Sequence, residues 1–465
     1  MKAYEVLNLL RISRPTLTKY VKERIIKTTI LPDGCYDYDV DSVYHLLNKD
    51  VKRKPKMNET VQRVEKHLIK KQDPFFPMLM EFCHHSKNLY NHANYFIKQE
   101  YRVNGKWLRY QELDKRLKVD MKFPDYKEMP TAQSAQQTLK LLDKNWKSFY
   151  ASMRDFKKHP EKYLGRPRPP KYLKKDGVYT LVLTNQNCKF DGEMIYFPKV
   201  FHGFTLKPMF VKNEKFVTFN QVRLIPHKDR IVLEVIYSVL PMPMKEENQR
   251  YVGIDLGVNN LATVANTIGK EAFLINGKPL KAINQFYNKK NSHYSKVCQC
   301  MNDKDYSSRR NRLTEKRNAK INDYMHKASK YIVNWCVNHD ISAIIIGKNR
   351  EWKQEVSMGK KNNQTFVEIP FARLIEMIQY KARDYGIAVI TTEESYTSGT
   401  SFIDNEEPTK EQYNKARRVY RGLFKANNQT QINADLNGAY QIIKKVFPIK
   451  WDRGCALHPV VVNLG

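Results

Sequence analysis

An apolar strand that ends in a carboxylate constrains what this sequence can fold into more than any other feature. Residues 251–266, YVGIDLGVNNLATVAN, predict a short strand from Tyr251 to Asp255, a turn, and a second strand from Leu261 to Ala265. A single carboxylate at the end of a buried strand is costly unless it is paired or binds a metal ion. Asp255 is therefore either a metal ligand or an acid that hydrogen-bonds the turn, and the residues alone favour neither interpretation.

Another strand, much later in the chain, is also predicted to end in acids. Residues Ala388–Glu394 (AVITTEE) predict a strand whose last two residues are Glu393 and Glu394. Because successive strand residues face opposite sides of a sheet, only one of these glutamates can point where Asp255 points. A central strand is also predicted over Ile341–Ile346, but it is followed by glycine and carries no acid.

A third acid lies in a predicted helix. Residues Gln431–Phe447 carry apolar side chains along one stripe, and Asp435 lies near the N-terminal end of this helix. Asp435 could instead cap the helix, and Asn433 could do so equally well. The helix therefore offers a carboxylate whose role depends on where the fold places it.

These acids suggest a site for magnesium. Mg²⁺ prefers oxygen ligands in octahedral geometry, and two ions about 3.5–4 Å apart need several carboxylates from distant parts of a chain. Asp255, one of Glu393 and Glu394, and Asp435 could supply them, so that a scissile phosphate is polarised and water is activated for in-line attack. No Gly-rich phosphate cradle, Ser/His/Asp set or HExxH motif competes with this interpretation.

The charge of the chain points to an anionic partner. Its 465 residues include 81 Lys and Arg against 48 Asp and Glu, which gives a formal net charge of +33. Nucleic acid is the first candidate for such a partner, and its binding should depend strongly on salt. A ribosomal or packaging protein is the alternative, which the pattern of acids disfavours. Because 41% of the residues are hydrophobic, the chain can bury several cores.

Two basic segments are candidate nucleic-acid contacts. The Pro-rich loop Gly165–Tyr172 and a long predicted helix or helix pair over Lys296–Lys330 are both dense in Lys and Arg. Their alternatives are an exposed connector and a solvated helix face. The candidate residues are Arg166, Arg168 and Lys171 in the loop and Arg309, Arg310, Arg312, Lys316 and Arg317 in the helix.

The first 49 residues predict a separate helix-turn-helix module. Helices are predicted over Ala3–Leu10 and Arg14–Lys22, followed by a hairpin over Lys27–Tyr38. The second helix would enter a major groove with Arg14, Thr16 and Lys19 facing outward. The alternative is a protein-docking module. The segment resembles the MerR-like domains found on serine-recombinase transposases.

Composition changes mark the domain boundaries. Residues 50–59 have linker composition, residues 60–244 predict strands with helices over about 76–157, and the Pro-Met-Pro-Met sequence before residue 245 breaks the chain. The predicted domains are therefore 1–49, 60–244 and 245–465.

The cysteines and the hydropathy indicate an intracellular protein. Seven cysteines are scattered without regular spacing, which argues against a disulfide framework. No apolar run reaches about 18 residues, so neither secretion nor a membrane span is expected. We expect a cytoplasmic, nucleoid-associated protein in a prokaryote, or a nuclear one in a eukaryote.

Beyond these patterns, the motifs resemble a known family. GIDLGVNNLATV resembles the first RuvC motif of TnpB proteins, the transposon-encoded relatives of type V CRISPR effectors, and INADLNGAYQIIKK resembles their third motif. The resemblance covers about residues 60–465. It implies an α/β multidomain fold, with an RNase H-like (RuvC) nuclease domain and a wedge β-barrel that carries a helical recognition insert. It also implies a Mg²⁺-dependent DNA endonuclease that uses a transposon-derived guide RNA and recognises a short motif beside its double-stranded DNA target.

The sequence departs from the family pattern in three places. The usual second-motif glutamate would lie at Gly347, where it is absent. In some branches, and in the related Fanzor proteins, a glutamate on a neighbouring strand precedes a Tyr-Thr-Ser run; that position matches Glu394, with Glu393 in reserve. Residues 397–430 contain no cysteine, so no structural zinc is expected, and the N-terminal module is an addition.

Two rival functions follow from these departures. If the acid missing at Gly347 has no replacement, the chain is a nuclease-inactive, RNA-guided DNA-binding protein or repressor. The N-terminal module also raises the hypothesis of a strand-transfer transposase, although no serine-recombinase catalytic domain follows it. Metal-dependent cleavage of a guide-matched plasmid, and a search for joined ends, distinguish these functions.

Overall fold

The computed structural model describes most of the chain. The described residues are 2–3, 6–7, 14–22, 26–31, 36–39, 42–43, 60–105, 107–120, 123–212, 215–302, 307–348, 368–420, 422–450, 452 and 454–464. The chain divides into two compact units, residues 1–240 and 241–465, which adjoin at the Pro-Met-Pro-Met sequence. None of the described helices has both the length and the apolar character that crossing a bilayer requires.

The N-terminal segment contains a helix and a small hairpin. Its elements are α2 (Arg14–Lys22), β1 (Thr28–Ile30) and β2 (Tyr36–Tyr38). Leu17, Ile26 and Tyr38 pack into a small core. Most of the helix predicted over 3–10, the linker 50–59 and the side chains of Thr16 and Lys19 lie outside the described residues. The helix-turn-helix interpretation therefore stays a prediction.

Residues 60–240 contain two antiparallel sheets. The larger sheet has the order β3-β9-β8-β4, and the smaller has the order β5-β6-β7. The strands are β3 (Val61–Lys70), β4 (Leu181–Thr184), β5 (Lys189–Phe190), β6 (Ile195–Tyr196), β7 (Thr205–Leu206), β8 (Phe216–Pro226) and β9 (Arg230–Val239), with short helices η3 (Lys199–Phe201) and η4 (Met209–Lys212) between them. The described strands pair as two separate sheets, so the closed barrel stays a prediction.

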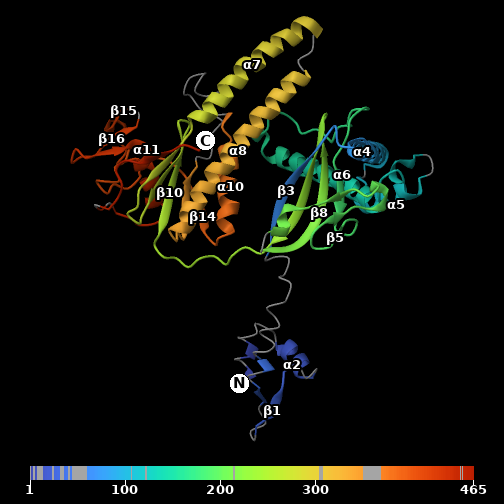
Figure 1. Ribbon diagram of the computed structural model, residues 1–465, viewed down its shortest axis with the longest axis horizontal. Helices are drawn as coiled ribbons and strands as arrows, with labels where there is room; N and C mark the ends of the chain where they lie inside the picture. The colour runs from blue at the N-terminus through green and yellow to red at the C-terminus, as the bar shows by residue number, and fades with distance from the viewer. Residues whose placement is uncertain are drawn as a thin grey trace. The chain divides into compact units, whose positions relative to one another are not determined.

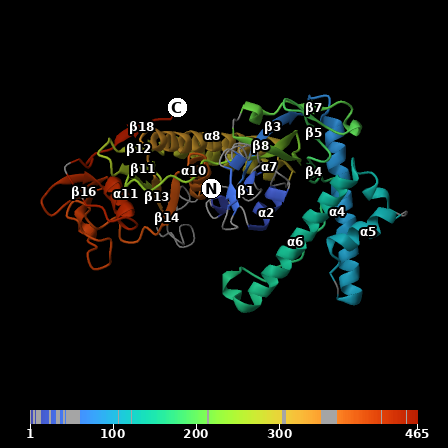
Figure 2. The same cartoon turned by 90° about the horizontal axis from the view of Figure 1, so that it is seen from below.

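Helices cover the larger sheet (Figure 2). Two helices contact its strands, α4 (Phe76–Asn104) and α6 (Ala132–Lys158). Three shorter ones, α5 (Tyr110–Val119), η1 (Pro124–Tyr126) and η2 (Pro160–Lys162), pack on α4 or α6. The amphipathic stretch 133–146 lies within α6, and its Trp146 donates a hydrogen bond from Nε1 to Oδ1 of Asn94 on α4, at 3.0 Å. Thr131 accepts a hydrogen bond from the backbone N–H of Ser134 and so caps α6.

The second unit is built on a six-stranded sheet with the order β14-β13-β10-β11-β12-β18. Strands β10 and β14 of this sheet are labelled in Figure 1. Its strands are β10 (Tyr251–Leu256), β11 (Asn260–Asn266), β12 (Phe273–Asn276), β13 (Ala343–Gly347), β14 (Ala388–Thr392) and β18 (Val460–Val462). Strand β10 is antiparallel to β11 and parallel to β13, which is parallel to β14. The central strands are apolar because helices cover both faces.

The two faces of this sheet are covered by different helices. Helices α8 (Ser308–Asn338) and α10 (Phe371–Arg383) form one core with Val252 and Ile254, whereas α11 (Ala434–Lys444) forms another with Tyr251 and Ile345. A further helix, α7 (Lys278–Asn302), packs against α8. A small sheet precedes α11 and consists of β15 (Arg418–Tyr420), β16 (Leu423–Lys425) and β17 (Gln431–Asn433), after η5 (Lys415–Arg417).

Two of the element boundaries that differ from the sequence-based expectation concern the candidate acids. The helix predicted from Gln431 begins only at Ala434, because residues 431–433 pair with β16 and Asn433 forms the N-cap. The strand predicted to run to Glu394 ends at Thr392, so both glutamates follow it.

Helix α11 and strand β10 approach each other at Gly253. A Cβ atom added at this glycine would lie 2.2 Å from the carbonyl oxygen of Ala439 and 2.5 Å from Cγ1 of Ile443. Both distances are far below van der Waals contact, and the first involves backbone, which cannot rotate away. Glycine is therefore required at this position for the helix to lie on the strand.

The substitution Gly253→Ala should destabilise the second unit. Overpacking of a core typically costs about 1–3 kcal/mol, and a backbone clash places this case at the upper end, so we expect roughly 3 kcal/mol. The matched control is Gly165→Ala, because a Cβ there would meet no atom within 4 Å. Urea unfolding of the two variants measures the effect, and equal stability of both would contradict the close approach.

Candidate active site

Three parallel strands bring the candidate acids to one edge of the sheet. Ile254 of β10 lies opposite Ile346 of β13, and Gly347 lies opposite Thr392 of β14. The next residue of β10 is Asp255, and Glu394 follows β14 by two residues. The carboxyl ends of parallel strands meet at the same edge, so these positions are neighbours although more than a hundred residues separate them in sequence.

Strand alternation decides which face they use. Val252, Ile254, Ile344 and Ile346 pack with α8 and α10, so the residues between and after them face α11. Asp255 and Gly347 accordingly lie on the α11 side of the sheet.

Glu394 occupies the space above Gly347. A Cβ atom added at Gly347 would lie 2.5 Å from Cγ and 2.7 Å from Oε1 of Glu394. The side chain of Glu394 is therefore located where a side chain of residue 347 would begin. Glu393, in contrast, is exposed. Of the two glutamates, Glu394 is the one that the structure brings to the edge where Asp255 lies.

The segment that carries Glu394 is held from two sides. Lys445, at the end of α11, donates from Nζ to the carbonyl oxygen of Glu393 at 2.8 Å and to Oγ of Ser395 at 3.2 Å. Thr397 donates from Oγ1 to the carbonyl oxygen of Glu394 at 2.8 Å. These bonds fix the backbone on either side of the glutamate and limit where its carboxylate can go.

Helix α11 brings Asp435 to the same edge. Asn433 caps the helix by accepting from the backbone N–H groups of Asp435 and Leu436, both at 3.1 Å, so Asp435 is not the cap. One turn later, a Cβ atom added at Gly438 would lie 3.0 Å from Oδ2 of Asp255. The helix backbone thus lies directly against the Asp255 carboxylate.

Asp435 has two polar partners. Its Oδ2 accepts from Nδ2 of Asn260 at 2.7 Å, and its Oδ1 accepts from Nη2 of Arg418 at 3.1 Å. Asn260 starts β11 and Arg418 starts β15, so two different elements orient this carboxylate. In this arrangement, no three His, Cys, Asp or Glu side chains among the described residues lie close enough to hold a metal ion.

Electrostatics shows that the three acids share one environment. Burial raises the pKa of Asp255 well above its usual range, and the nearby Glu394 and Asp435 raise it further, while Arg418 opposes them. Burial also raises the pKa of Glu394 to about 7, and Lys445 acts to lower it. Like charges in a desolvated space repel each other, and a divalent cation would relieve that repulsion. Carboxylate oxygens of like charge are the donor type that Mg²⁺ takes, although the three side chains do not converge on a common point in this arrangement.

The basic helix pair uses some of its arginines within the protein. Arg310 donates from Nε to Oδ1 of Asn291 at 3.0 Å, and Arg317 donates from Nε to Oδ1 of Asn284 at 2.8 Å, so both join α8 to α7. The remaining candidates of this helix are exposed; they are Arg309, Arg312 and Lys316. Arg309 also lies over the ring of Tyr294 on α7, with 5.0 Å between its guanidinium carbon and the ring centre. Arg312 and Lys316 are therefore the candidates of this helix best placed to contact a nucleic acid.

The other predicted nucleic-acid contacts are placed on the first unit. Arg166, Arg168 and Lys171 are exposed or half-buried on the Pro-rich loop, and Arg14 is exposed on α2. The loop is anchored to α4 by Asn91, which donates to the carbonyl oxygen of Leu173 at 2.9 Å and accepts from its N–H at 2.8 Å. These basic candidates therefore belong to one compact unit, and the three acids belong to the other.

Sequence reasoning missed Asn260, Arg418 and Lys445 as parts of this site. Asn260 ends the turn that follows β10, so its closeness in sequence to Asp255 could have identified it. Arg418 and Lys445 carry no such signal, because each contacts its partner only through the tertiary fold.

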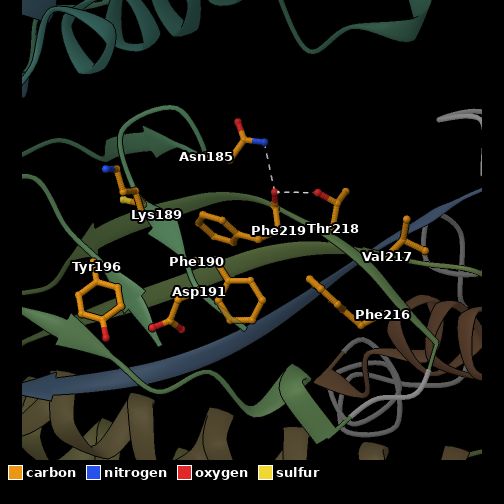
Figure 3. Close-up of a pocket in the computed structure, with 10 residues that line it drawn as sticks. Asn185, Lys189, Phe190, Asp191, Tyr196, Phe216, Val217, Thr218 and Phe219 are labelled. Carbon is orange, nitrogen blue, oxygen red and sulfur yellow. Dashed lines mark hydrogen bonds between the residues drawn. The ribbon is translucent and has the colours of Figure 1, made fainter. Parts of the chain in front are cut away.

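A cavity of about 690 Å³ in the first unit has a different character. Figure 3 shows Phe190, Phe216 and Phe219 around it, with Lys189 and Asp191 at its side. Asp191 accepts from the backbone N–H groups of Glu193 and Met194 at 2.9 and 2.8 Å, so it closes the turn between β5 and β6. Asp191, the one acid that lines this cavity, therefore has a structural role. The cavity is not a second cluster of metal ligands.

Two family models match the chain. Residues 231–353 match OrfB_IS605, described as a probable transposase, and residues 371–442 match the Cas12f1-like TNB domain. The first segment contains Asp255, and the second contains Glu394 and Asp435. A comparison with curated proteins found no match.

Solved structures of RNA-guided nucleases are also similar to the chain. A Cas12f1–sgRNA–target DNA complex matches with 12% identity and a TM-score of 0.33, covering 82% of this chain and 98% of that one. The mini-RNA-guided endonuclease CRISPR-Cas_phi3 matches with 10% identity and a TM-score of 0.43, covering 93% and 97%. CasPhi-2 bound to crRNA and phosphorothioate DNA matches with 9% identity and a TM-score of 0.43, covering 94% and 99%.

The raised pKa values of Asp255 and Glu394 predict that these two acids stabilise the metal-free protein less at neutral pH than in acid. An acid whose pKa is higher in the folded chain contributes stability below its unfolded pKa, and that stability is lost as pH rises through its folded pKa. For Glu394 the window runs from 4.5 to about 7. At about 1.4 kcal/mol per pKa unit, its contribution is roughly 3 kcal/mol.

Urea unfolding at pH 5 and pH 8, with a chelator present, measures this effect. Glu394→Gln should lose less stability than the wild type between the two pH values. Glu393→Gln is the matched control, because that neighbouring glutamate is exposed, and it should behave as the wild type does. An unchanged pH dependence in Glu394→Gln would show that Glu394 is not buried among other acids.

Proposed function

We propose that this chain, which is TnpB-like by its two family matches, is an RNA-guided DNA endonuclease of the RuvC type. The observation that carries the proposal is the meeting of three carboxylates, Asp255, Glu394 and Asp435, at one edge of a mixed sheet. They come from three elements far apart in the sequence, and Glu394 and Asp435 both raise the cost of ionising Asp255. Like charges brought together in this way favour the binding of a cation, which would relieve their repulsion.

The proposed cofactor is Mg²⁺, held by Asp255, Glu394 and Asp435. When bound, it supplies Lewis-acid polarisation of the scissile phosphate and lowers the pKa of a water molecule that attacks it. Lys445 and Thr397 keep the Glu394 segment in place, and Asn260 orients the Asp435 carboxylate. Arg418, which pairs with Asp435, is near enough to the acids to contact a phosphate as well.

The proposed partners are a guide RNA and a double-stranded DNA target. The net charge of +33 supports a polyanionic partner, and exposed basic residues in both units offer cationic surface for it. Within this proposal, residues 245–465 form the nuclease domain, and residues 60–244 form the wedge with a helical recognition insert. Residues 1–49 form a DNA-binding helix-turn-helix, joined by the linker 50–59. Recognition of a short motif beside the target, and the origin of the guide in a transposon end, belong to the same proposal.

The alternative is an RNA-guided DNA-binding protein that does not cut. It is favoured by Gly347, which leaves the end of β13 without an acid. Against it, Glu394 fills the space above that glycine and the segment around it is fixed by three hydrogen bonds. A chain that had no nuclease activity would have no need of this arrangement.

The substitution Asp255→Ala should abolish cleavage of a guide-matched plasmid. RNA and DNA binding should stay largely intact, because the carboxylate is not part of the exposed basic surface. Gel analysis of the plasmid with Mg²⁺, and binding assays without it, measure both properties. Glu393→Ala is the control, and it should cleave as the wild type does. Cleavage that survives Asp255→Ala would refute the assignment of the site.

The space shared by residues 347 and 394 gives a second prediction. A methyl group at Gly347 would displace the Glu394 side chain, and a misplacement of about 1 Å can cost roughly 100-fold in rate, so Gly347→Ala should slow cleavage by about that factor. The methyl group would also lie 2.6 Å from Cδ1 of the buried Ile442. Because every contacted atom belongs to a side chain and none to the backbone, the fold should persist at some cost in stability.

A paired variant tests the same relation from the other direction. Glu394→Ala should be inactive, and adding Gly347→Glu to it should recover part of the cleavage, because the new carboxylate would extend into the vacated space. Cleavage rates of the single and double variants decide the question. If Glu394→Ala cuts at the wild-type rate, the non-cutting alternative is also excluded and another acid must act.

A further inference from the structure

A second cavity of the first unit lies among the helices of residues 76–158 and holds no candidate catalytic acid. Its volume is about 670 Å³, within the range of about 300–1,000 Å³ typical of small-ligand sites. It is lined by the end of α4, the segment before α5, the second half of α6 and the Pro-rich loop. The helices that carry it are labelled in Figure 2.

The walls of this cavity are aromatic. Tyr150 of α6 lies near their centre, with ring centroids of Trp107 at 5.1 Å, Phe149 at 5.2 Å and Tyr101 at 6.4 Å. Tyr101 is 47% exposed, so the cluster is open to solvent on one side instead of closing into a core. An open set of rings offers flat apolar surfaces to a planar ligand.

The polar part of the cavity is cationic. Five of its ten lining residues are basic and none is acidic; the five are Arg109, Lys147, Arg154, Lys157 and Arg166. Beneath them, the buried carboxylate of Asp143 (5% exposed) holds Nε of Arg109 at 3.4 Å and Nζ of Lys147 at 2.7 Å. The guanidinium of Arg109 lies 4.6 Å from the centre of the Trp107 ring. Two of the cations are therefore held in place next to the aromatic surface.

The remaining three cations lie beside the rings. Arg154, Lys157 and Arg166 form no ion pair with any acid in the described part of the chain. With Asp143 neutralising one charge at most, the cavity has a surplus of about four positive charges next to four aromatic rings. This combination matches a ligand with a flat ring and an attached phosphate.

We infer that this cavity binds an unpaired nucleotide of a nucleic acid, with the base on Tyr101, Trp107 and Tyr150 and the flanking phosphates on Arg154, Lys157 and Arg166. Base–aromatic stacking combined with cationic backbone contacts is the general mode of single-strand binding. A base inside a duplex is covered on both faces, so a paired nucleotide cannot enter. The inference adds a site to the proposed function and relies on it only for the presence of a nucleic acid.

The test compares single-stranded and double-stranded probes on the full chain. The probes are a fluorescein-labelled single-stranded RNA, a single-stranded DNA of the same sequence, and the corresponding RNA duplex. Tyr101→Ala should weaken single-strand binding about fivefold or more, since stacking is worth about 1–3 kcal/mol per base, and should leave duplex binding unchanged. Tyr95→Ala is the matched control, because Tyr95 is also on α4 and 47% exposed but does not line the cavity.

A second pair of variants tests the phosphate contacts. Arg154→Ala combined with Lys157→Ala should lower the salt slope of single-strand binding by about 1.4, which is about 0.7 for each phosphate that the variant no longer neutralises. The control is Lys140→Ala combined with Lys144→Ala, two exposed cations of α6 outside the cavity. RNA carrying 5-iodouridine should also crosslink, on irradiation, to a peptide that contains Trp107 or Tyr150.

The outcomes separate the inference from the proposed function. Stronger effects on RNA identify the guide as the source of the nucleotide, stronger effects on DNA identify a target strand, and both support the site. If Tyr101→Ala weakens duplex and single strand alike, or if the cavity variants bind as their controls do, the inference is overturned while the nuclease proposal stands. If the chain binds none of the probes, both fail.

Discussion

The contact of α11 with β10, with no side chain between them, is the constraint on which the second unit depends. Gly253 lets the helix backbone reach the strand, and Gly438 lets it reach the carboxylate of Asp255. A helix seated one side chain farther away would carry Asp435 away from the edge where the parallel strands end. The two glycines thus allow α11 to lie close enough to β10 for Asp435 to be near Asp255.

Bringing these acids together lowers the stability of the folded chain when they are ionised. Burial and mutual repulsion raise the pKa of Asp255, and burial raises that of Glu394, so the ionised site opposes folding at neutral pH. The charges of Arg418 and Lys445 offset part of this cost by acting to lower the pKa of Asp255 and of Glu394, and Asn260 donates a hydrogen bond to Asp435. A loss of folding stability of this kind is typical of sites that are completed by a ligand.

Much of this unit could be predicted from local patterns. The apolar strand ending in Asp255 and the helical stripe after Asp435 have strong periodicities, and strand alternation alone showed that only one of Glu393 and Glu394 could join them. Choosing Glu394 over Glu393 required the pairing register of β14 with β13. That register depends on both strands and cannot be predicted from either one alone. The partners Arg418 and Lys445 were not predictable for the same reason. Periodicity also indicated one helix from Gln431, whereas pairing with a neighbouring strand delays its start to Ala434.

The space above Gly347 has a consequence for how relatives of this chain are compared. Because one side chain fits there, the carboxylate can be supplied from either of two adjoining strands, and a column-by-column alignment would score the chain as defective. Under the proposed function, a relative should therefore be judged by the side chain that occupies this space at the sheet edge and not by its aligned residue alone.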